Sequence, residues 1–364
     1  MSPARLGTLV RLDLLQRLRS IAWYVLLGVF ALLLLGATVL SQFAFGVSAD
    51  GWGSGVYSVV VYITLLLVML VSPTLSGNSI NGDRDGATLA PVQVTLATTG
   101  EILWAKFLAA WVTGLAFVVV AVPFLVFAAL TGAVSAATGV VAVAVLIVEA
   151  GIVAAIGVAV SGLLSRPLFS VATTYLVVAA LTVGTVIGFG LIGTAIRSDA
   201  TMTSRDLAYD PVTGEPICID GATDCEMDPR LMECGPWTVD EYTLPRYDTV
   251  WWLLAANPFV ILADATPTTF DRYGSPQDLF GQVKVGIRFA QLPPDLDTRW
   301  DGCAGGEWSS QNDQSTAEEM LASTIPSWFV GLGVQVLLAA GLLWGAWMRM
   351  RTPARRLPRG SRIA

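Results

Sequence analysis

The chain has 364 residues, of which 54% are hydrophobic and only 13% are charged, so its composition lies outside the range of soluble globular proteins. It contains no histidine, which excludes Ser-His-Asp and Cys-His catalytic sets, the H-E-x-x-H metalloprotease motif and histidine metal centres. The net charge of -7 is uneven: residues 197–325 carry -14 and the rest of the chain +7. We therefore expect a membrane protein, and a catalytic function is disfavoured.

The first predicted element is a helix at the N-terminus. Its arginines and Asp13 fall mostly away from one apolar stripe, which consists of Val10, Leu14, Leu18 and Ile21. This pattern predicts an amphipathic helix on the inner membrane surface. The alternative is that these residues are only the beginning of the first membrane span.

Long uncharged runs follow, and each is long enough to cross a membrane. A spanning helix needs about 20 apolar residues, so the run of 42 residues between Lys106 and Glu149 must hold two passes. They would turn at the Gly/Ser/Thr-rich stretch "TGAVSAATG". The sequence thus predicts an all-α polytopic protein with six spans, at 21–42, 56–78, 106–130, 139–164, 168–195 and 326–348.

The distribution of Lys and Arg sets the predicted orientation. The loops "SQFAFGVSADGWGSG" and "TGAVSAATG" contain no basic residue. Basic residues occur instead before the first span, at Arg84 and Lys106 between spans two and three, at Arg166 between spans four and five, and in the C-terminal tail. By the positive-inside rule, both termini lie in the cytoplasm and residues 197–325 lie outside. The use of 19 Arg against 2 Lys, with abundant Ala, Val and Gly, is typical of a high-GC bacterium and predicts the bacterial cytoplasmic membrane.

Residues 197–325, between spans five and six, are too long for a simple connection and predict a small extracellular insertion. Proline, glycine and aspartate are scattered through it without periodicity, which indicates a loop-rich domain. It holds all four cysteines of the chain, Cys218, Cys225, Cys234 and Cys303. Their spacing does not match the short pairs of zinc sites and the outer face is oxidising, so we expect two disulfides and no metal, with three pairings open.

Within that insertion lies "WWLLAANPFVILA", residues 251–263. It is apolar but too short to span, and Pro258 interrupts it. A re-entrant or interfacial helix before the last span is therefore expected, rather than a core helix of a soluble domain.

The polar stretch "INGDRDGATLAPVQVTLATTGEILWAKF", residues 80–107, separates spans two and three. Pro91 would stop or kink any helix that forms there. Thr98 with Glu101 three residues later has the capping-box pattern, which predicts a new helix that continues into span three. The chain would thus make a short structured excursion, although a random polar loop would serve the same topology.

This stretch resembles the membrane subunits of ATP-binding-cassette exporters of the ABC-2 type. The matching residues are Asp83, Arg84, Thr88 and Leu89, followed by Thr95, Glu101, Ile102, Leu103 and Lys106. The departures are Ala87 in place of a glycine, with Gly86 one position early, and Ala105 before Lys106. Six spans, internal termini, an N-terminal surface helix and short helices before the last span also resemble the family's plan, and the cysteine-bearing insertion is an elaboration.

The resemblance implies that residues 79–100 hold a coupling helix that docks on a separate ATPase subunit. The implied contact residues are Asp83, Arg84, Asp85, Thr88, Leu89, Glu101 and Lys106. Because the chain lacks a G-x-x-x-x-G-K-[ST] loop, ATP and Mg would bind to that partner, and this chain would bind no cofactor.

The resemblance further implies a homodimer or a heterodimer with a second permease chain, because six spans fall short of a complete exporter of this family. The expected cargo is an amphiphilic, drug-like or lipid-like molecule. The division of the chain is then 1–196 for the surface helix and spans one to five, 197–325 for the extracellular domain, and 326–364 for span six and a basic tail.

Glu149 lies about midway along the fourth predicted span, and a charge there costs at least about 2.5–3.5 kcal/mol. No Lys, Arg or His lies within any span to pair with it. It is a candidate for the translocation pathway or for a hydrogen bond between helices. It also supports the alternative of an ion-coupled secondary transporter. A scaffold or sensor with an outer ligand domain would have the same topology, and no nucleic-acid motif occurs.

Overall fold

The computed structural model describes residues 2–45, 53–85, 98–132, 134–219, 231–304, 307–309 and 316–351. The chain forms two compact units. The helical unit comprises Met1–Val186, Trp252–Ile287 and Pro326–Ala364, and the sheet unit comprises Ile187–Trp251 and Arg288–Ile325.

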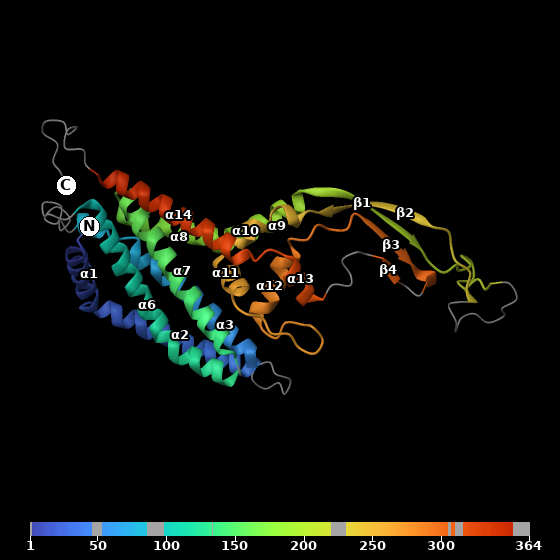
Figure 1. The fold of residues 1–364 in the computed structure, drawn as a ribbon, viewed down its shortest axis with the longest axis horizontal. Coiled ribbons are helices and arrows are strands. Elements are labelled where there is room, and N and C mark those ends of the chain that lie inside the picture. The colour runs from blue at the N-terminus through green and yellow to red at the C-terminus, as the bar shows by residue number, and fades with distance from the viewer. Residues whose placement is uncertain are drawn as a thin grey trace. The chain divides into compact units, whose positions relative to one another are not determined.

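Six of the described helical segments are long and apolar enough to cross a membrane (Figure 1). They are Ile21–Phe45, Gly55–Arg84, Thr99–Thr131, Ala136–Leu163, Pro167–Ala195 and Ser327–Met350. The six predicted spans are thereby confirmed, and the protein is a multi-pass membrane protein.

The individual elements subdivide these spans and add short helices around them. The first part of the chain contains α1 (Pro3–Leu18), α2 (Ile21–Phe45), α3 (Gly53–Ser76), α4 (Asn81–Asp85), α6 (Thr99–Thr131) and α7 (Ala136–Leu163). The next span contains α8 (Pro167–Ala179), a π-helical turn (Ala180–Gly184) and α9 (Thr185–Ala195). The later helices are α10 (Trp251–Ala255), α11 (Pro258–Ala265), α12 (Leu279–Phe289), α13 (Ala317–Ser323) and α14 (Ser327–Met350).

Side-chain caps explain where two spans begin. Thr98 precedes α6 and accepts a hydrogen bond from the Glu101 backbone, while the Glu101 side chain accepts one from the Thr98 backbone. This confirms the predicted capping box and begins the third span several residues earlier than the hydrophobic run alone indicated. At α7 the cap is Ser135, which accepts from the Thr138 backbone, within the turn predicted at "TGAVSAATG".

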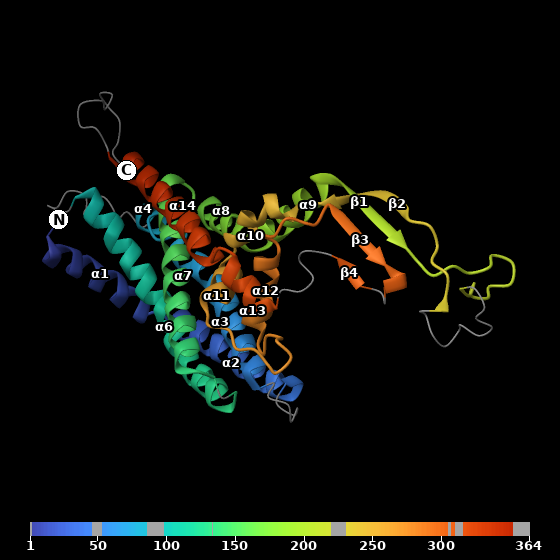
Figure 2. The ribbon, with the colours of Figure 1, turned by 45° about the vertical axis from the view of Figure 1, so that its right-hand side comes forward.

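Helix α7 occupies the core of the helical unit, and it packs against α3, α6, α8, α11 and α14 (Figures 1 and 2). Its second half is almost wholly buried and consists mainly of alanine, valine and glycine. Small residues allow close approach: a Cβ on Gly157 would lie 1.9 Å from Ser76 Oγ of α3, and one on Gly162 would lie 2.9 Å from Ala346 Cβ of α14. Close backbone contact of this kind is typical of helix packing in membranes, where hydrophobic exclusion does not drive helices together.

The segment predicted as one short helix at 251–263 forms two, α10 and α11, joined by a turn at Ala256 and Asn257. Asn257 caps α11 by accepting from the Phe259 backbone, and Pro258 stands at the first helical position, where its missing N–H is harmless. The turn lies against α14 so closely that a Cβ on Gly331 would be 1.8 Å from the Ala255 carbonyl oxygen. From α11, Asp264 accepts hydrogen bonds from the backbones of Ser327 and Trp328 and so caps α14.

The sheet unit departs from the predicted all-α chain with a loop-rich insertion. Its described residues form a four-stranded sheet in the order β2-β1-β3-β4. The strands are β1 (Arg197–Arg205), β2 (Thr238–Pro245), β3 (Asp297–Asp301) and β4 (Glu307–Ser309). The first two are antiparallel, with Arg197 opposite Pro245, whereas β3 runs parallel to β1 and antiparallel to β4. Because β2 is exposed along most of its length, its sequence carries no alternation of apolar and polar residues from which to predict it.

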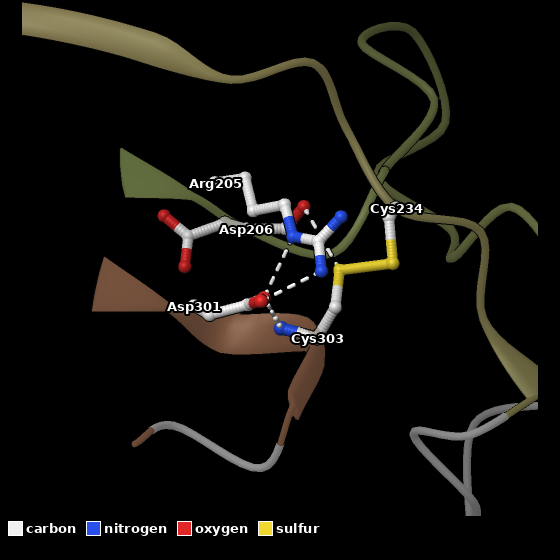
Figure 3. Close-up of polar contacts among 5 residues, drawn as sticks. All are labelled: Arg205, Asp206, Cys234, Asp301 and Cys303. Atoms are coloured by element: carbon white, nitrogen blue, oxygen red, sulfur yellow. Dashed lines mark hydrogen bonds and ion pairs between the residues drawn. A yellow bond between two sulfur atoms is a disulfide. The ribbon is translucent and has the colours of Figure 1, made fainter. Parts of the chain in front are cut away.

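One disulfide, Cys234–Cys303, joins the segment before β2 to the turn after β3 (Figure 3). Beside it, the Arg205 guanidinium donates to both carboxylate oxygens of Asp301, at 2.7 and 2.6 Å (Figure 3). Cys218 is also disulfide-bonded, and Cys225 lies outside the described residues. Among the described residues, no group of three or more His, Cys, Asp or Glu could hold a metal ion.

Candidate functional site

Four charged side chains from three helices meet at one end of the helical unit. The Lys106 Nζ of α6 lies 2.8 Å from Asp13 Oδ1 of α1 and forms a second ion pair with Asp83 Oδ2 of α4. The side chains of Lys106 and Asp13 are only 11% and 10% exposed, and that of Asp83 is 26% exposed. Arg17 lies one helical turn beyond Asp13 and interacts with both carboxylates. We call Asp13, Arg17, Asp83 and Lys106 the ionic cluster.

Burial makes the members of the ionic cluster depend on one another. Burial lowers the pKa of the Arg17 guanidinium, and the charges of Asp13 and Asp83 oppose this shift. Two acids and two bases make the group formally neutral, which is the condition under which charges are tolerated away from water. Removal of one member would leave its counter-charge without compensation. The cluster therefore joins α1, α4 and α6 through charge.

Glu101 makes a second connection between α1 and α6. It is 1% exposed, and its Oε1 accepts from the Ser2 backbone at 2.7 Å while its Oε2 accepts from the Thr98 backbone at 2.9 Å. Together with the pair of Lys106 and Asp13, this fixes α1 to α6 at two places (Figure 2).

Helix α4 is held against the end of α7. The Ser161 hydroxyl accepts hydrogen bonds from the Ile80 and Asn81 backbones at 3.0 and 3.2 Å. Arg84 donates to the Leu164 carbonyl at 3.3 Å, and Leu164 is the C-terminal cap of α7. A cation at a helix C-terminus is favoured by the helix dipole. The segment that leaves the second span is therefore fixed to three other helices before residue 86.

The structure joins two of the predicted contact residues, Asp83 and Lys106, in an ion pair, whereas Arg84 contacts the end of α7 and Glu101 contacts the start of α1. Glu101 and Lys106 are buried inside the chain, whereas Asp83 and Arg84 are half-buried. The Asp85 side chain, Thr88 and Leu89 lie outside the described residues, as does most of the predicted coupling helix.

Asp13, Arg17 and Ser161 were not predicted to take part in this site. For Asp13 a signal exists, because it is the only acidic residue before Asp50 and is surrounded by arginines. The predicted apolar stripe of α1 is buried only in part: Val10 and Leu14 are half-buried, whereas Leu18 and Ile21 are exposed. Asp13 is the buried residue of the helix, and it holds α1 to α6 through its ion pair with Lys106.

Glu149, the predicted intramembrane carboxyl group, lies on α7 and is 1% exposed. Gln335 of α14 is the polar side chain beside it and is fully buried. Gln335 Nε2 donates to the Ala256 carbonyl at 3.0 Å, in the turn between α10 and α11. Neither carboxyl oxygen of Glu149, nor Gln335 Oε1, has a hydrogen-bond partner among the described residues.

The same turn continues this line of buried polar groups. Asn257 Nδ2 donates to the Thr182 carbonyl at 2.6 Å and to Thr185 Oγ1 at 2.9 Å. Thr182 lies in the π-helical turn between α8 and α9, and such turns are frequent at functional sites. Glu149, Gln335, Ala256, Asn257 and Thr182 are called the buried polar line. It connects α7, α14, the α10–α11 turn and the fifth span.

An aromatic groove of about 790 Å³ lies between α6 and α14. Its walls include Trp104, Phe107, Trp344 and Trp347, and Arg351 lies 4.0 Å from the Trp347 ring centroid. An apolar groove with one cation at its end is chemically suited to an amphiphile.

No model of a protein family matches this chain, and no curated protein matches it. A function must therefore be argued from the sequence resemblance and from the contacts described above.

Proposed function

We propose that the chain is the transmembrane permease subunit of an ABC exporter of the ABC-2 type. It would move an amphiphilic, drug-like or lipid-like substrate out across the bacterial cytoplasmic membrane. ATP and Mg would be bound by a separate ATPase subunit, and two permease chains, identical or different, would form the pathway.

The observation that carries this proposal is the fixed position of α4. A motor can move membrane helices only through a stiff element that is connected to them. The ionic cluster ties α4 to α1 and α6, and Ser161 and Arg84 tie it to α7. A force applied to this segment would reach α6 and α7 directly and α1 through Lys106. The Asp-Arg motif of the family resemblance lies at this position.

The orientation in this proposal follows from the basic residues. Both termini and the ionic cluster would face the cytoplasm, and the sheet unit with its disulfide would lie outside. The α10–α11 turn would enter the membrane from the outside without crossing it, since neither helix is long enough to span. The aromatic groove supports an amphiphilic cargo, because it combines an apolar wall with a single cation.

The roles of the predicted contact residues can be divided by burial. Glu101 and Lys106 would position the docking segment from inside the chain. Asp83 and Arg84 would both hold the segment and border the docking surface. Asp85, Thr88 and Leu89 would make the contact with the ATPase subunit.

The test is co-purification of a candidate ATPase subunit with the full chain, followed by measurement of ATP turnover in lipid nanodiscs. We expect the wild type to retain the ATPase and an Asp83→Ala/Arg84→Ala double variant to lose it or to lose substrate-stimulated turnover. Arg166→Ala is the matched control, because Arg166 is an exposed cation in the other short loop of the same predicted face. Equal binding and equal turnover for the double variant and the control would contradict the proposal.

A second candidate, an ion-coupled secondary transporter, is supported by the burial of Glu149 without a basic partner. In that case uptake or efflux in vesicles would follow an imposed proton gradient without ATP, and Glu149→Gln would abolish it. Transport that requires ATP and persists in Glu149→Gln would exclude this candidate.

A further inference from the structure

We propose that Glu149 holds a proton and donates it in a hydrogen bond to Gln335 Oε1, forming a proton-dependent clasp between α7, α14 and the α10–α11 turn. The inference does not depend on the energy source of transport, because the clasp would exist in an ATP-driven or an ion-driven protein.

Three neighbouring acceptor atoms lack a donor. Glu149 Oε1 and Oε2 and Gln335 Oε1 are each buried, and none of them receives a hydrogen bond from the described residues. The amide nitrogen of Gln335 donates to the Ala256 carbonyl at 3.0 Å, and no hydrogen bond from its second N–H to Glu149 is found among the described residues. Buried polar atoms are almost always satisfied, so an arrangement of acceptors alone lacks a component.

A single proton supplies that component. On Glu149 it removes the charge, whose burial is costly, and it converts one carboxyl oxygen from an acceptor into a donor. Gln335 Oε1 is then the acceptor for which no other donor is found among the described residues. Only one O–H bond forms, and the proton comes from water.

A metal cation fits this place less well. A hard cation requires several oxygen ligands, typically six to eight for Ca²⁺. Glu149 and Gln335 offer three side-chain oxygens, and no group of three metal-ligating side chains occurs in the described residues.

Most of the charged and titratable groups on the helices packed against α7 have other partners. Lys106 and Glu101 of α6 belong to the connections with α1, and Asp264 of α11 caps α14. The hydroxyls of Tyr57 on α3 and Tyr175 on α8 donate to backbone carbonyls, of Gly139 and Leu70 respectively.

Two further groups on these helices remain. Tyr62 of α3 packs its ring against Phe259 and Phe280. Arg349 of α14 lies close enough to Arg84 for the two positive charges to repel each other. None of these groups supplies a counter-charge or a donor to Glu149.

The position of the clasp gives it a mechanical consequence. Gln335 connects Glu149 on one side with the Ala256 carbonyl on the other, and Asn257 extends the line to the π-helical turn. Loss of the proton would leave the ionised Glu149 carboxylate, which can only accept hydrogen bonds, beside Gln335 Oε1, which can also only accept. The α10–α11 turn would then lose its contact with α7 through Gln335, and water or a cationic group could enter.

The first test is infrared difference spectroscopy of the full chain in nanodiscs at neutral pH, wild type minus Glu149→Gln, in H₂O and D₂O. The proposal predicts one extra protonated-carboxyl C=O band in the wild type that shifts in D₂O. It also predicts that Gln335→Met moves this band to higher frequency, because the hydrogen bond is lost. The Gln335→Met comparison remains informative if Glu149→Gln does not fold.

Three outcomes would overturn the proposal. They are a difference spectrum with only ionised-carboxylate bands, a protonated band that Gln335→Met leaves unmoved, and a protonated band that appears only when Na⁺ is removed. Thermal unfolding gives an independent measure of the clasp. Glu149→Gln should retain the wild-type Tm because its amide can also donate to Gln335 Oε1, whereas Glu149→Leu should lower it. Equal Tm values for both variants would contradict the clasp.

Discussion

The ionic cluster and the buried polar line place carboxyl groups among the same helices in opposite ways. In the ionic cluster, Asp13 and Asp83 both pair with Lys106, a base from another helix, and Arg17 balances the second negative charge. In the buried polar line, no base among the described residues pairs with Glu149, and the amide of Gln335 is the polar side chain beside it. The difference shows that a carboxyl group can join helices permanently or conditionally, depending on whether a fixed charge or an exchangeable proton balances it.

The largest expected effect comes from removing the shared base of the ionic cluster. Lys106→Met removes the base with which Asp13 and Asp83 both pair and leaves the ionic cluster with a net negative charge, so we expect a loss of about 3 kcal/mol in the free energy of unfolding. The measurement is denaturant unfolding in detergent micelles followed by tryptophan fluorescence. Arg166→Met is the control, because this exposed cation should change stability by less than about 0.5 kcal/mol. A Lys106→Met protein as stable as the control would show that the ion pairs of Lys106 with Asp13 and Asp83 do not contribute to stability.

The next largest effect is expected where the α10–α11 turn contacts α14. Gly331→Ala would place a Cβ 1.8 Å from the Ala255 oxygen and 2.6 Å from its carbonyl carbon, so the α10–α11 turn must move away from α14. We expect a loss of about 2 kcal/mol by the same unfolding assay. Gly333→Ala is a matched control on the same helix, since nothing lies within 4 Å of its Cβ, and it should be neutral or slightly stabilising. Similar stabilities for the two variants would refute the close contact.

A pair of isosteric changes compares the two carboxyl settings directly. Asp13→Asn removes a charge that Lys106 needs and should cost about 1.5 kcal/mol. Glu149→Gln replaces a neutral acid by a neutral amide and should change stability by less than about 0.5 kcal/mol. Both proteins would be measured side by side in the unfolding assay. A greater loss in Glu149→Gln than in Asp13→Asn would reverse the comparison.

The smallest effect concerns a third carboxyl setting, in the sheet unit. The Arg246 guanidinium donates to both oxygens of Asp248, at 2.8 and 2.7 Å, and lowers the pKa of that carboxyl group. Because the folded-state pKa lies below the unfolded one, the stabilisation is present above about pH 3.9 and is lost as pH falls through the folded pKa.

Because solvent screens this partly exposed pair, we expect the smallest effect of the series. The Tm of wild type and Asp248→Asn, measured from pH 6 downward, should differ at neutral pH and converge in acid. A difference that persists at the lowest pH would rule out the ionic origin.

The sequence predicted the spanning helices because their signal is local. The fourth predicted span, 139–164, corresponds to Ala136–Leu163, and the capping box at Thr98 lies where its pattern indicated. The ionic cluster was out of reach, since Asp13 and Lys106 are separated by 93 positions and neither shows a periodic pattern toward the other. The role of Gln335 could not be predicted, because a single polar residue in an apolar helix does not indicate which neighbour it contacts. The sheet was missed because its polar strands have no hydrophobic alternation.

The contact between Gly157 and Ser76 has a consequence for how this chain can vary. Since a Cβ on residue 157 would lie 1.9 Å from Ser76 Oγ, the two positions share a volume that holds only one side chain larger than hydrogen. Homologous chains that keep this crossing of α3 and α7 should therefore change the two positions together. A relative with alanine at the position of Gly157 is expected to carry glycine at the position of Ser76, so that the pair behaves as one inherited character.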